Sequence, residues 1–169
     1  AAVCDSDGAT AARLSTEFSV AVLDAAQVFA DDGITAVAIA APPTQHFPLA
    51  KAALEAGKHV FVEKPISNTL EDGRAMIAAA EAAGVVLAVG HSYRRHGALR
   101  HLRRLIDEGE LGRVSLAEGV FSNDNGLALE AGVWRSDPAE IPGGCLMQIG
   151  IHQIDNLLYL LGPVIDVSA

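Results

Sequence analysis

The chain of 169 residues is close to the size of one ordinary domain and is long enough to bury a core. Half of its residues are hydrophobic and 20% are charged, which excludes disordered, collagen-like and low-complexity chains. The 12 Lys and Arg against 21 Asp and Glu give a net charge of −9, and such an acidic surface argues against a nucleic-acid partner.

The ends and the cysteines bear on the cellular setting. No apolar run approaches the ~18 residues of a membrane-spanning helix, so we expect no membrane partner. The chain opens AAVCD, with neither a basic segment nor Met, so we expect no signal peptide and an internal piece of a longer protein. Cys4 and Cys145 form no CxxC pair, which argues against a disulfide framework or a cysteine zinc site. We predict that both are buried in a reducing, cytoplasmic environment.

In the first half of the chain, short apolar runs alternate with helical patterns. The predicted strands are residues 1–4, 20–23, 35–40, 59–62 and 85–89, and the predicted helices are residues 9–18, 24–31, 45–56 and 69–83. Asp24 is expected to cap the second helix, and Asn68 with Glu71 to form a capping box on the fourth. Strands apolar on both faces and separated by helices indicate βαβ units. We therefore predict a doubly wound α/β domain, a partial Rossmann-like parallel sheet, in residues 1–91.

After Gly90 the pattern changes. The predicted elements are an amphipathic helix at 99–108, an antiparallel strand at 113–121, an irregular stretch at 122–142, a strong helix at 144–161 and a last strand at 164–168. This order predicts the start of an α+β domain with an incomplete sheet in residues 92–169.

Polar residues follow several of the predicted strands, where open parallel sheets bind their ligands. They are Asp5, the segment Pro42 to His46, the tripeptide Glu63-Lys64-Pro65, and Gly90 with His91. An acidic residue such as Asp5 can bind the adenosine ribose hydroxyls and favours NAD over NADP. It can equally be a helix cap or a turn residue. No GxGxxG glycine loop occurs in the chain.

The tripeptide Glu63-Lys64-Pro65 carries acid–base chemistry. Burial and a cationic nicotinamide ring would both disfavour the ammonium form of Lys64, which prepares an amine for proton transfer. Pro65 restricts the backbone of Lys64 and permits a cis bond. Glu63 can accept bonds from ribose hydroxyls or pair with Lys64. The alternative is a polar turn between strand and helix.

In the late helix, Gln148, His152 and Asp155 share one face because of their spacing. His152 can relay a substrate proton and Asp155 can orient it, although a helical His is often a packing residue. A metal site is disfavoured because Gln is a poor zinc ligand. Trp134 and Arg135 can bind an anion beside an apolar ring, or they can anchor an ordinary loop. The basic cluster that begins at Arg94 is followed by Asp107, Glu108 and Glu110, so a solvated helix face is the preferred interpretation.

The order of these motifs resembles the Gfo/Idh/MocA oxidoreductases. The matching stretches are APPTQH (41–46), ALEAGKHVFVEKPISNTLEDG (53–73), AGVVLAVGHSYRRHGALR (83–100), ELGRV (110–114) and GGCLMQIGIHQIDNLLYLLG (143–162). They cover nearly the whole chain and are specific together. The resemblance implies a Rossmann domain, a C-terminal α/β domain with an open sheet, and dimer or tetramer contacts in the full-length protein.

The resemblance also implies roles for the motif residues. Lys64 would contact the nicotinamide ribose and the substrate hydroxyl, Glu63 and Pro65 would shape that pocket, and Pro42 and His46 would line the nicotinamide. His91 belongs to the same set of cofactor residues. His152 would be the acid–base or substrate-binding histidine, with Gln148 and Asp155 beside it, and Trp134 and Arg135 would lie against the cofactor.

Two departures from the family pattern stand out. The family often has Asp where this chain has Gln148, which puts a Lys–Asp–His arrangement in doubt. The family's first strand, glycine loop and first helix are missing, as are most C-terminal strands. A missing central strand would leave apolar edges exposed and remove the pyrophosphate site. We therefore expect this piece alone neither to fold well nor to bind NAD.

The leading hypothesis is an oxidoreductase that transfers hydride between NAD and a secondary alcohol of a sugar, cyclitol or nucleotide sugar, with NADP kept as an alternative cofactor. Two other functions stay open. One is an NAD-dependent glycosidase of the same family. The other is a non-catalytic sensor or assembly module that retains the fold, in which Gln148 marks decay of the site.

Overall fold

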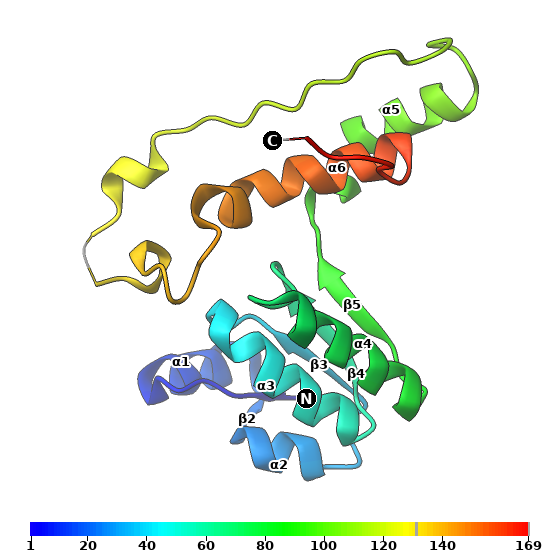
Figure 1. The fold of residues 1–169 in the computed structure, drawn as a ribbon. Coiled ribbons are helices and arrows are strands. Elements are labelled where there is room, and N and C mark those ends of the chain that lie inside the picture. Colours follow the sequence, from blue (N-terminus) through cyan, green and yellow to red (C-terminus); the bar gives the residue numbers. More distant parts are fainter. Residues whose placement is uncertain (131, 169) are drawn as a thin grey trace. The chain divides into compact units, whose positions relative to one another are not determined.

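A computed structural model describes residues 1–130 and 132–168. Ala131, within the predicted irregular stretch, and Ala169 lie outside the described residues. The chain forms two compact units, which meet in sequence between Val89 and Gly90 (Figure 1). The first unit carries the parallel strands of a Rossmann-like α/β fold, as the alternation of strands and helices predicts.

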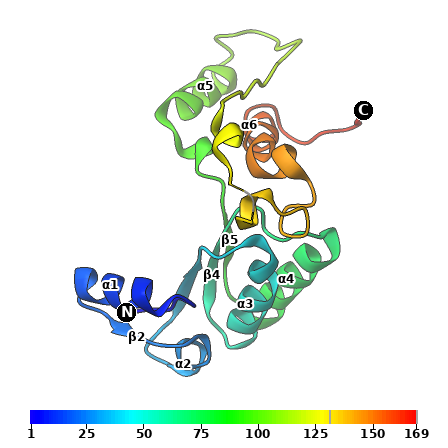
Figure 2. The ribbon, with the colours of Figure 1, turned by 90° about the vertical axis from the view of Figure 1, so that its left-hand side faces the viewer.

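The strands of the first unit form two sheets rather than one continuous sheet. β1 (Ala2–Val3) pairs in parallel with β2 (Ala21–Val22). The second sheet has the order β3 (Ala36–Ile39), β4 (His59–Glu63), β5 (Leu87–Gly90), and β3 and β4 are parallel (Figure 2). In the strand order of dinucleotide-binding folds, one further strand lies between the counterparts of β1 and β3. The described residues do not include it.

The helices of the first unit begin and end at the residue types that such ends favour. They are α1 (Gly8–Phe18), α2 (Ala25–Ala30), α3 (Pro43–Glu55) and α4 (Leu70–Ala83). Asp24 caps α2 and forms a capping box with Gln27, which confirms the predicted cap. The capping box predicted from Asn68 is wrong, because the hydroxyl of Thr69 accepts the N–H of Asp72 at the start of α4.

The core of the first unit lies between the β3–β4–β5 sheet and the helices α3 and α4, which run side by side (Figure 2). Val60 and Val62 point into it from β4, where the exposed Phe61 alternates with them. Leu54 of α3 and Met76 of α4 are fully buried against these valines. This packing fixes the carboxyl ends of β3 and β4 on a rigid support.

The second unit is mainly helical in its described part. Its elements are the 3-10 helix η1 (Tyr93–Arg95), α5 (Gly97–Asp107), two further 3-10 helices η2 (Asn125–Ala128) and η3 (Trp134–Ser136), the π-helix η4 (Leu146–Gly150) and α6 (Ile151–Leu161). The late helix predicted at 144–161 is confirmed, and it contains a π-helical turn, η4, directly before α6. Arg103 of α5 donates to the carbonyl oxygens of Tyr159 and Leu160, which satisfies free carbonyls at the end of α6.

Two predicted strands of the second unit are wrong. Residues 113–121 and 164–168 belong to no strand, and no described segment pairs with them. Leu116, Val120 and Ile165 in these segments are largely exposed. Their alternating pattern is typical of a sheet, but a strand needs a neighbour to accept its ladder hydrogen bonds.

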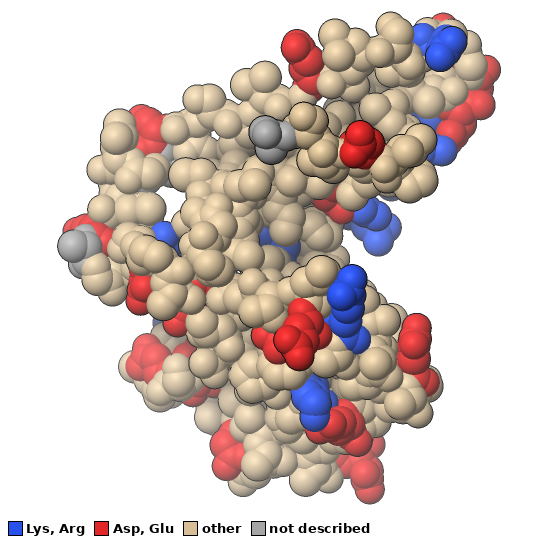
Figure 3. Space-filling view, viewed as in Figure 1, with Lys and Arg blue, Asp and Glu red and all other residues tan. Residues whose placement is uncertain are grey.

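The molecular surface corrects one further prediction. Cys4 and Cys145, expected in the core, are both exposed. Cys4 follows β1 and Cys145 directly precedes η4, and neither belongs to the core cluster of the first unit. Acidic side chains are spread over the face shown in Figure 3, with Lys and Arg among them. Within the described residues, no helix has both the length and the apolar character to cross a membrane.

Candidate functional site

The register of β3 and β4 brings the predicted cofactor residues of the first unit to one edge. Ile39 is paired with Val62, so the segment that begins at Ala41 and the tripeptide that begins at Glu63 leave the sheet at the same end. Pro42 precedes α3 directly, and the first turn of this helix extends the edge. This edge is the carboxyl end of a parallel sheet, where the fold class binds its ligands.

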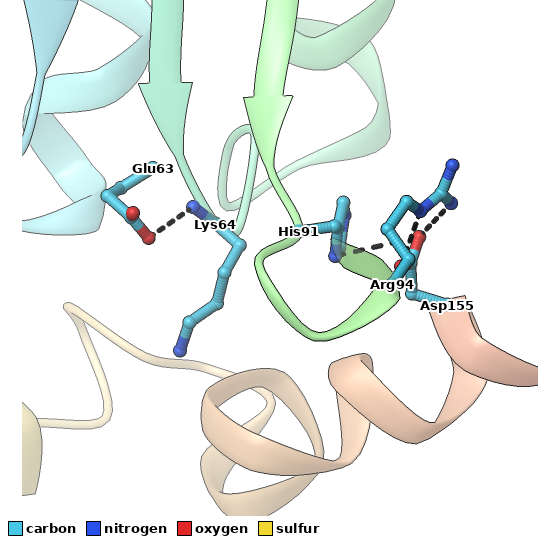
Figure 4. A network of polar contacts seen from close by, with 5 residues as sticks. All are labelled: Glu63, Lys64, His91, Arg94 and Asp155. Atoms are coloured by element: carbon cyan, nitrogen blue, oxygen red, sulfur yellow. Dashed lines mark hydrogen bonds and ion pairs between the residues drawn. The ribbon is translucent and has the colours of Figure 1, made fainter. Parts of the chain in front are cut away.

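Lys64 is held in the turn after β4. The carboxylate of Glu63 accepts the backbone N–H of Lys64 at 3.2 Å, and the Lys64 side chain extends away from that carboxylate (Figure 4). The Lys64–Pro65 peptide bond is cis, the isomer that the sequence permits. Glu63 therefore pairs with Lys64 as one of the sequence alternatives predicts, but through the backbone N–H of the lysine.

His46 lies in the first turn of α3 and is only 1% exposed. The resemblance places this side chain along the nicotinamide. In the structure, its Nδ1 lies 2.7 Å from the carbonyl oxygen of Pro65, and its Nε2 lies 2.9 Å from that of Ala41. Both polar atoms of the ring are thus engaged by the two loops that leave β3 and β4.

Asp5 follows β1 and is exposed. Its Oδ1 accepts the N–H of Asp7 at 2.8 Å, so Asp5 forms a turn, one of the roles that the sequence left open. The helix cap is Asp7, whose pKa is lowered by hydrogen bonds from the hydroxyl of Thr10 and from the N–H groups of Ala9 and Thr10. A carboxylate at the end of β1 suits ribose hydroxyl donors.

In the second unit, Asp155 of α6 is buried and forms an ion pair with Arg94 of η1. The Arg94 Nε donates to Oδ2 at 2.8 Å, and a second guanidinium nitrogen bonds Oδ1 (Figure 4). The hydrogen bonds to Asp155 raise the pKa of Arg94 above its usual value. His91 Nδ1 lies 3.7 Å from the same carboxylate. Asp155 therefore ties α6 to the segment that follows β5.

His152 of α6 is buried against aromatic rings. The ring of Tyr93 stacks on it, with 4.2 Å between the centroids and 22° between the planes. Phe121 stacks on the same tyrosine at 5.8 Å. The imidazole of His91 meets that of His152 edge-on at 6.4 Å. The rings of Tyr93 and His91 therefore both restrict the orientation of the His152 ring.

Gln148 lies in the π-helix and reaches η3. Its Nε2 donates to the carbonyl oxygen of Arg135 at 2.8 Å, and the guanidinium of Arg135 lies over the Trp134 ring, 4.2 Å from its centroid. The predicted Trp134–Arg135 pair is thus a compact turn fastened to η4. π-Helical turns often occur at functional sites.

Sequence reasoning missed two residues of the second unit. Arg94 was grouped with a solvated basic face, although it binds buried Asp155, and Tyr93 was not considered, although it stacks on His152. Both belong to the stretch HSYRR, which lies inside a quoted match to the family. The match of this stretch to the family was the feature of the sequence that could have identified Tyr93 and Arg94 as site residues. Within the described residues, no cluster of three or more His, Cys, Asp or Glu side chains could hold a metal ion.

The parallel strands and the helices that follow them are typical of a Rossmann-like fold. Residues 1–91 match the model of the oxidoreductase family with an NAD-binding Rossmann fold, and residues 99–169 match the GFO/IDH/MocA C-terminal domain. The chain belongs to the Gfo/Idh/MocA oxidoreductase family.

Several characterised relatives are similar to this chain. The 1,5-anhydro-D-fructose reductase of Ensifer adhaerens is 38% identical over 135 residues, which are 80% of this chain and 40% of that protein. The scyllo-inositol 2-dehydrogenase (NAD(+)) of Bacillus subtilis is 35% identical, over 84% of this chain and 40% of the relative. A structure of levoglucosan dehydrogenase in complex with NADH and levoglucosan matches 95% of this chain and 44% of that one, with a TM-score of 0.79 and 29% identity. The chain thus spans less than half of these relatives.

Proposed function

We propose that the protein carrying this chain is an NAD-dependent oxidoreductase that acts on a secondary alcohol of a sugar, cyclitol or nucleotide sugar. The observation that carries the proposal is the strand-end edge of the first unit, where Pro42 and the Glu63-Lys64-Pro65 turn leave β3 and β4 together. The relatives support it, because their names describe reductases and dehydrogenases of such compounds.

The residues of the first unit fit a bound dinucleotide at two places. The exposed carboxylate of Asp5 can accept ribose hydroxyls at the end of β1, and it would repel a 2′-phosphate, which favours NAD over NADP. Pro42, Glu63 and Pro65 would surround the nicotinamide ribose at the ends of β3 and β4. The nicotinamide ring, when bound, supplies the hydride chemistry.

In this proposal Lys64 holds and exchanges the proton of the substrate hydroxyl. Its backbone is tied by Glu63, and its flexible side chain ends in a group that donates as an ammonium and accepts a proton as an amine. A proton-transfer group of this kind contributes about 100-fold or more to a rate.

In the second unit, we assign substrate binding or proton relay to His152, with the imidazole oriented by Tyr93. Asp155 keeps the backbone of α6 in place through Arg94, and His91, close to the same carboxylate, would complete the cofactor residues. Trp134 and Arg135 would lie against the cofactor, on a turn that Gln148 fastens.

The test is Lys64→Ala in the full-length protein. NADH affinity, measured by fluorescence titration, should stay within a few-fold of the wild type. The kcat for NAD reduction with inositols and 1,5-anhydro sugars should fall by about 100-fold or more. The matched control is Lys51→Ala, because Lys51 is a lysine of the same unit whose exposed side chain pairs with Glu55 on the outer face of α3.

Two outcomes would contradict the proposal. An unchanged kcat in Lys64→Ala would exclude Lys64 as the proton-transfer group. Wild-type protein that binds NADH but turns over no polyol or sugar, and whose biological output survives Lys64→Ala, would indicate a sensor. Release of a sugar without net NADH would instead indicate the glycosidase reaction.

A further inference from the structure

His46 is a buried histidine whose two ring nitrogens both contact backbone carbonyl oxygens. Its side chain is almost completely buried, and each ring nitrogen faces a backbone carbonyl oxygen. Carbonyl oxygens only accept hydrogen bonds and a neutral imidazole carries one N–H, so the ring donates to the carbonyl that faces its protonated nitrogen. The shorter contact, 2.7 Å from Nδ1 to Pro65, is a strong hydrogen bond by its distance.

The partners of this ring lie on either side of the candidate site. Ala41 follows β3, and Pro65 follows Lys64 directly. The residue before Lys64 is also tied to it, because the Glu63 carboxylate accepts the Lys64 N–H. The turn that carries Lys64 is therefore fixed at both ends, by Glu63 on β4 and by His46 on α3. Both anchors stand on elements that pack in the core, β4 and α3.

We propose that His46 is the positioning residue of Lys64: its Nδ1–H holds the Pro65 carbonyl and so sets the direction from which the lysine side chain leaves the turn. The Ala41 carbonyl oxygen lies 2.9 Å from Nε2 and would receive a hydrogen bond only in the tautomer that carries the hydrogen there. In this role His46 acts through the turn and not on a reacting atom. The inference rests on the proposed function only for its effect on turnover.

Side-chain chemistry offers a matched pair of variants. The amide nitrogen of Asn is as many bonds from Cβ as Nδ1 of His, and the amide nitrogen of Gln is as many bonds from Cβ as Nε2. His46→Asn therefore keeps a donor for Pro65, whereas His46→Gln keeps a donor for Ala41. Both variants are polar and smaller than or similar to the imidazole, so a general loss of packing affects them alike.

The first experiment compares these variants in the full-length protein. His46→Asn should retain kcat within about 5-fold of the wild type, and His46→Gln should lose about 100-fold, the effect of misplacing a reacting group by about 1 Å. The Kd for NADH should be the same in both, and their melting temperatures should match. Equal kcat values in the two variants, or a better kcat in His46→Gln, would overturn the proposal.

The second experiment needs no turnover, so it separates this inference from the proposed function. In wild-type protein labelled with 15N, the ring signal of His46, assigned through His46→Asn, should show a hydrogen on Nδ1 at pH 7. In protein whose lysines carry 13C-methyl groups, the Lys64 signal, assigned through Lys64→Arg, should move in His46→Gln and stay in His46→Asn. An Nδ1 without a hydrogen, or a Lys64 signal that ignores both variants, would overturn the inference.

Discussion

Gln148 occupies a position where the family often has Asp, and its contact explains what an amide can do there. Its Nε2 donates to the Arg135 carbonyl, and a carboxylate cannot donate this bond. The departure from the family pattern therefore has a structural use in this chain: it fastens the Trp134–Arg135 turn to the π-helix. Decay of the site is not needed to account for the residue.

A variant tests this use. Gln148→Glu keeps the size of the side chain but replaces the donor with an acceptor that faces the Arg135 carbonyl, so the turn should loosen. Because Trp134 is the one tryptophan of the chain, a 5-fluorotryptophan label should report the change as a shifted and broadened 19F signal. Gln153→Glu makes the same chemical change on α6, one turn away, and should leave the signal unchanged. A wild-type signal in Gln148→Glu would contradict the assignment.

For single residues, the sequence predicted contacts correctly where both partners are a few positions apart in the chain. Asp24 caps its helix through residues three positions away, so the local pattern was sufficient. Thr69 was missed because neighbouring Asn68 satisfies the same rule, and only the backbone decides which of them stands at the cap. The hydrogen-bond partners of His46 could not be predicted, since they are set by the packing of α3 on β4.

Among the elements, α6 is held to η1 by an ion pair with a buried carboxylate. Its face carries His152, and Asp155 on the same helix is bound through two oxygens by Arg94. A carboxylate that is mostly buried loses much of its hydration, so removal of the guanidinium leaves an uncompensated charge. The ion pair thus holds the helix in the position that lets Tyr93 stack on His152.

A double-mutant cycle measures this contact. Arg94→Ala, Asp155→Asn and the double variant should give a coupling of about 1 to 2 kcal/mol in the free energy of unfolding, reduced from the fully buried case because Arg94 is partly exposed. The exposed pair of Arg104 and Glu108 on α5 is the control, with a coupling of about 0.5 kcal/mol or less. Urea unfolding gives both values. Equal coupling in the two cycles would show that burial adds nothing.

The sequence predicted helices better than strands, for a physical reason. The backbone hydrogen bonds of α3, α4 and α5 join residues that are close in sequence. The hydrophobic periodicity and the residues that end helices were therefore enough to predict these three helices. A strand needs a partner, and the segments at 113–121 and 164–168 have none among the described residues. The π-helical turn within the late helix could not be predicted, because it changes the hydrogen-bond pattern without changing the composition.

For the chain as a whole, the two sheets of the first unit should differ in stability. Val60 and Val62 of β4 are buried beneath α3 and α4, whereas β1 and β2 have two residues each and Val22 is half exposed. Local opening is easiest where few apolar groups are buried.

Amide hydrogen exchange should reveal this difference. The N–H of Val60, bonded to Val86, should exchange about 100-fold or more slowly than that of Leu23, which is bonded to Val3 beside the smaller sheet. Mass-spectrometric or NMR detection at the peptide or residue level provides the comparison within one sample. Equal protection of the two amides would mean that both sheets open together, as one cooperative unit.

The two exposed cysteines allow each unit of the chain to be labelled at one site. Cys4 lies in the first unit and Cys145 in the second, and both thiols are open to solvent. Each unit therefore offers one attachment point for a maleimide dye, close to the start of β1 in one case and to η4 in the other. With two dyes on these cysteines, single-molecule energy transfer would measure whether the distance between the two labels changes when a ligand binds.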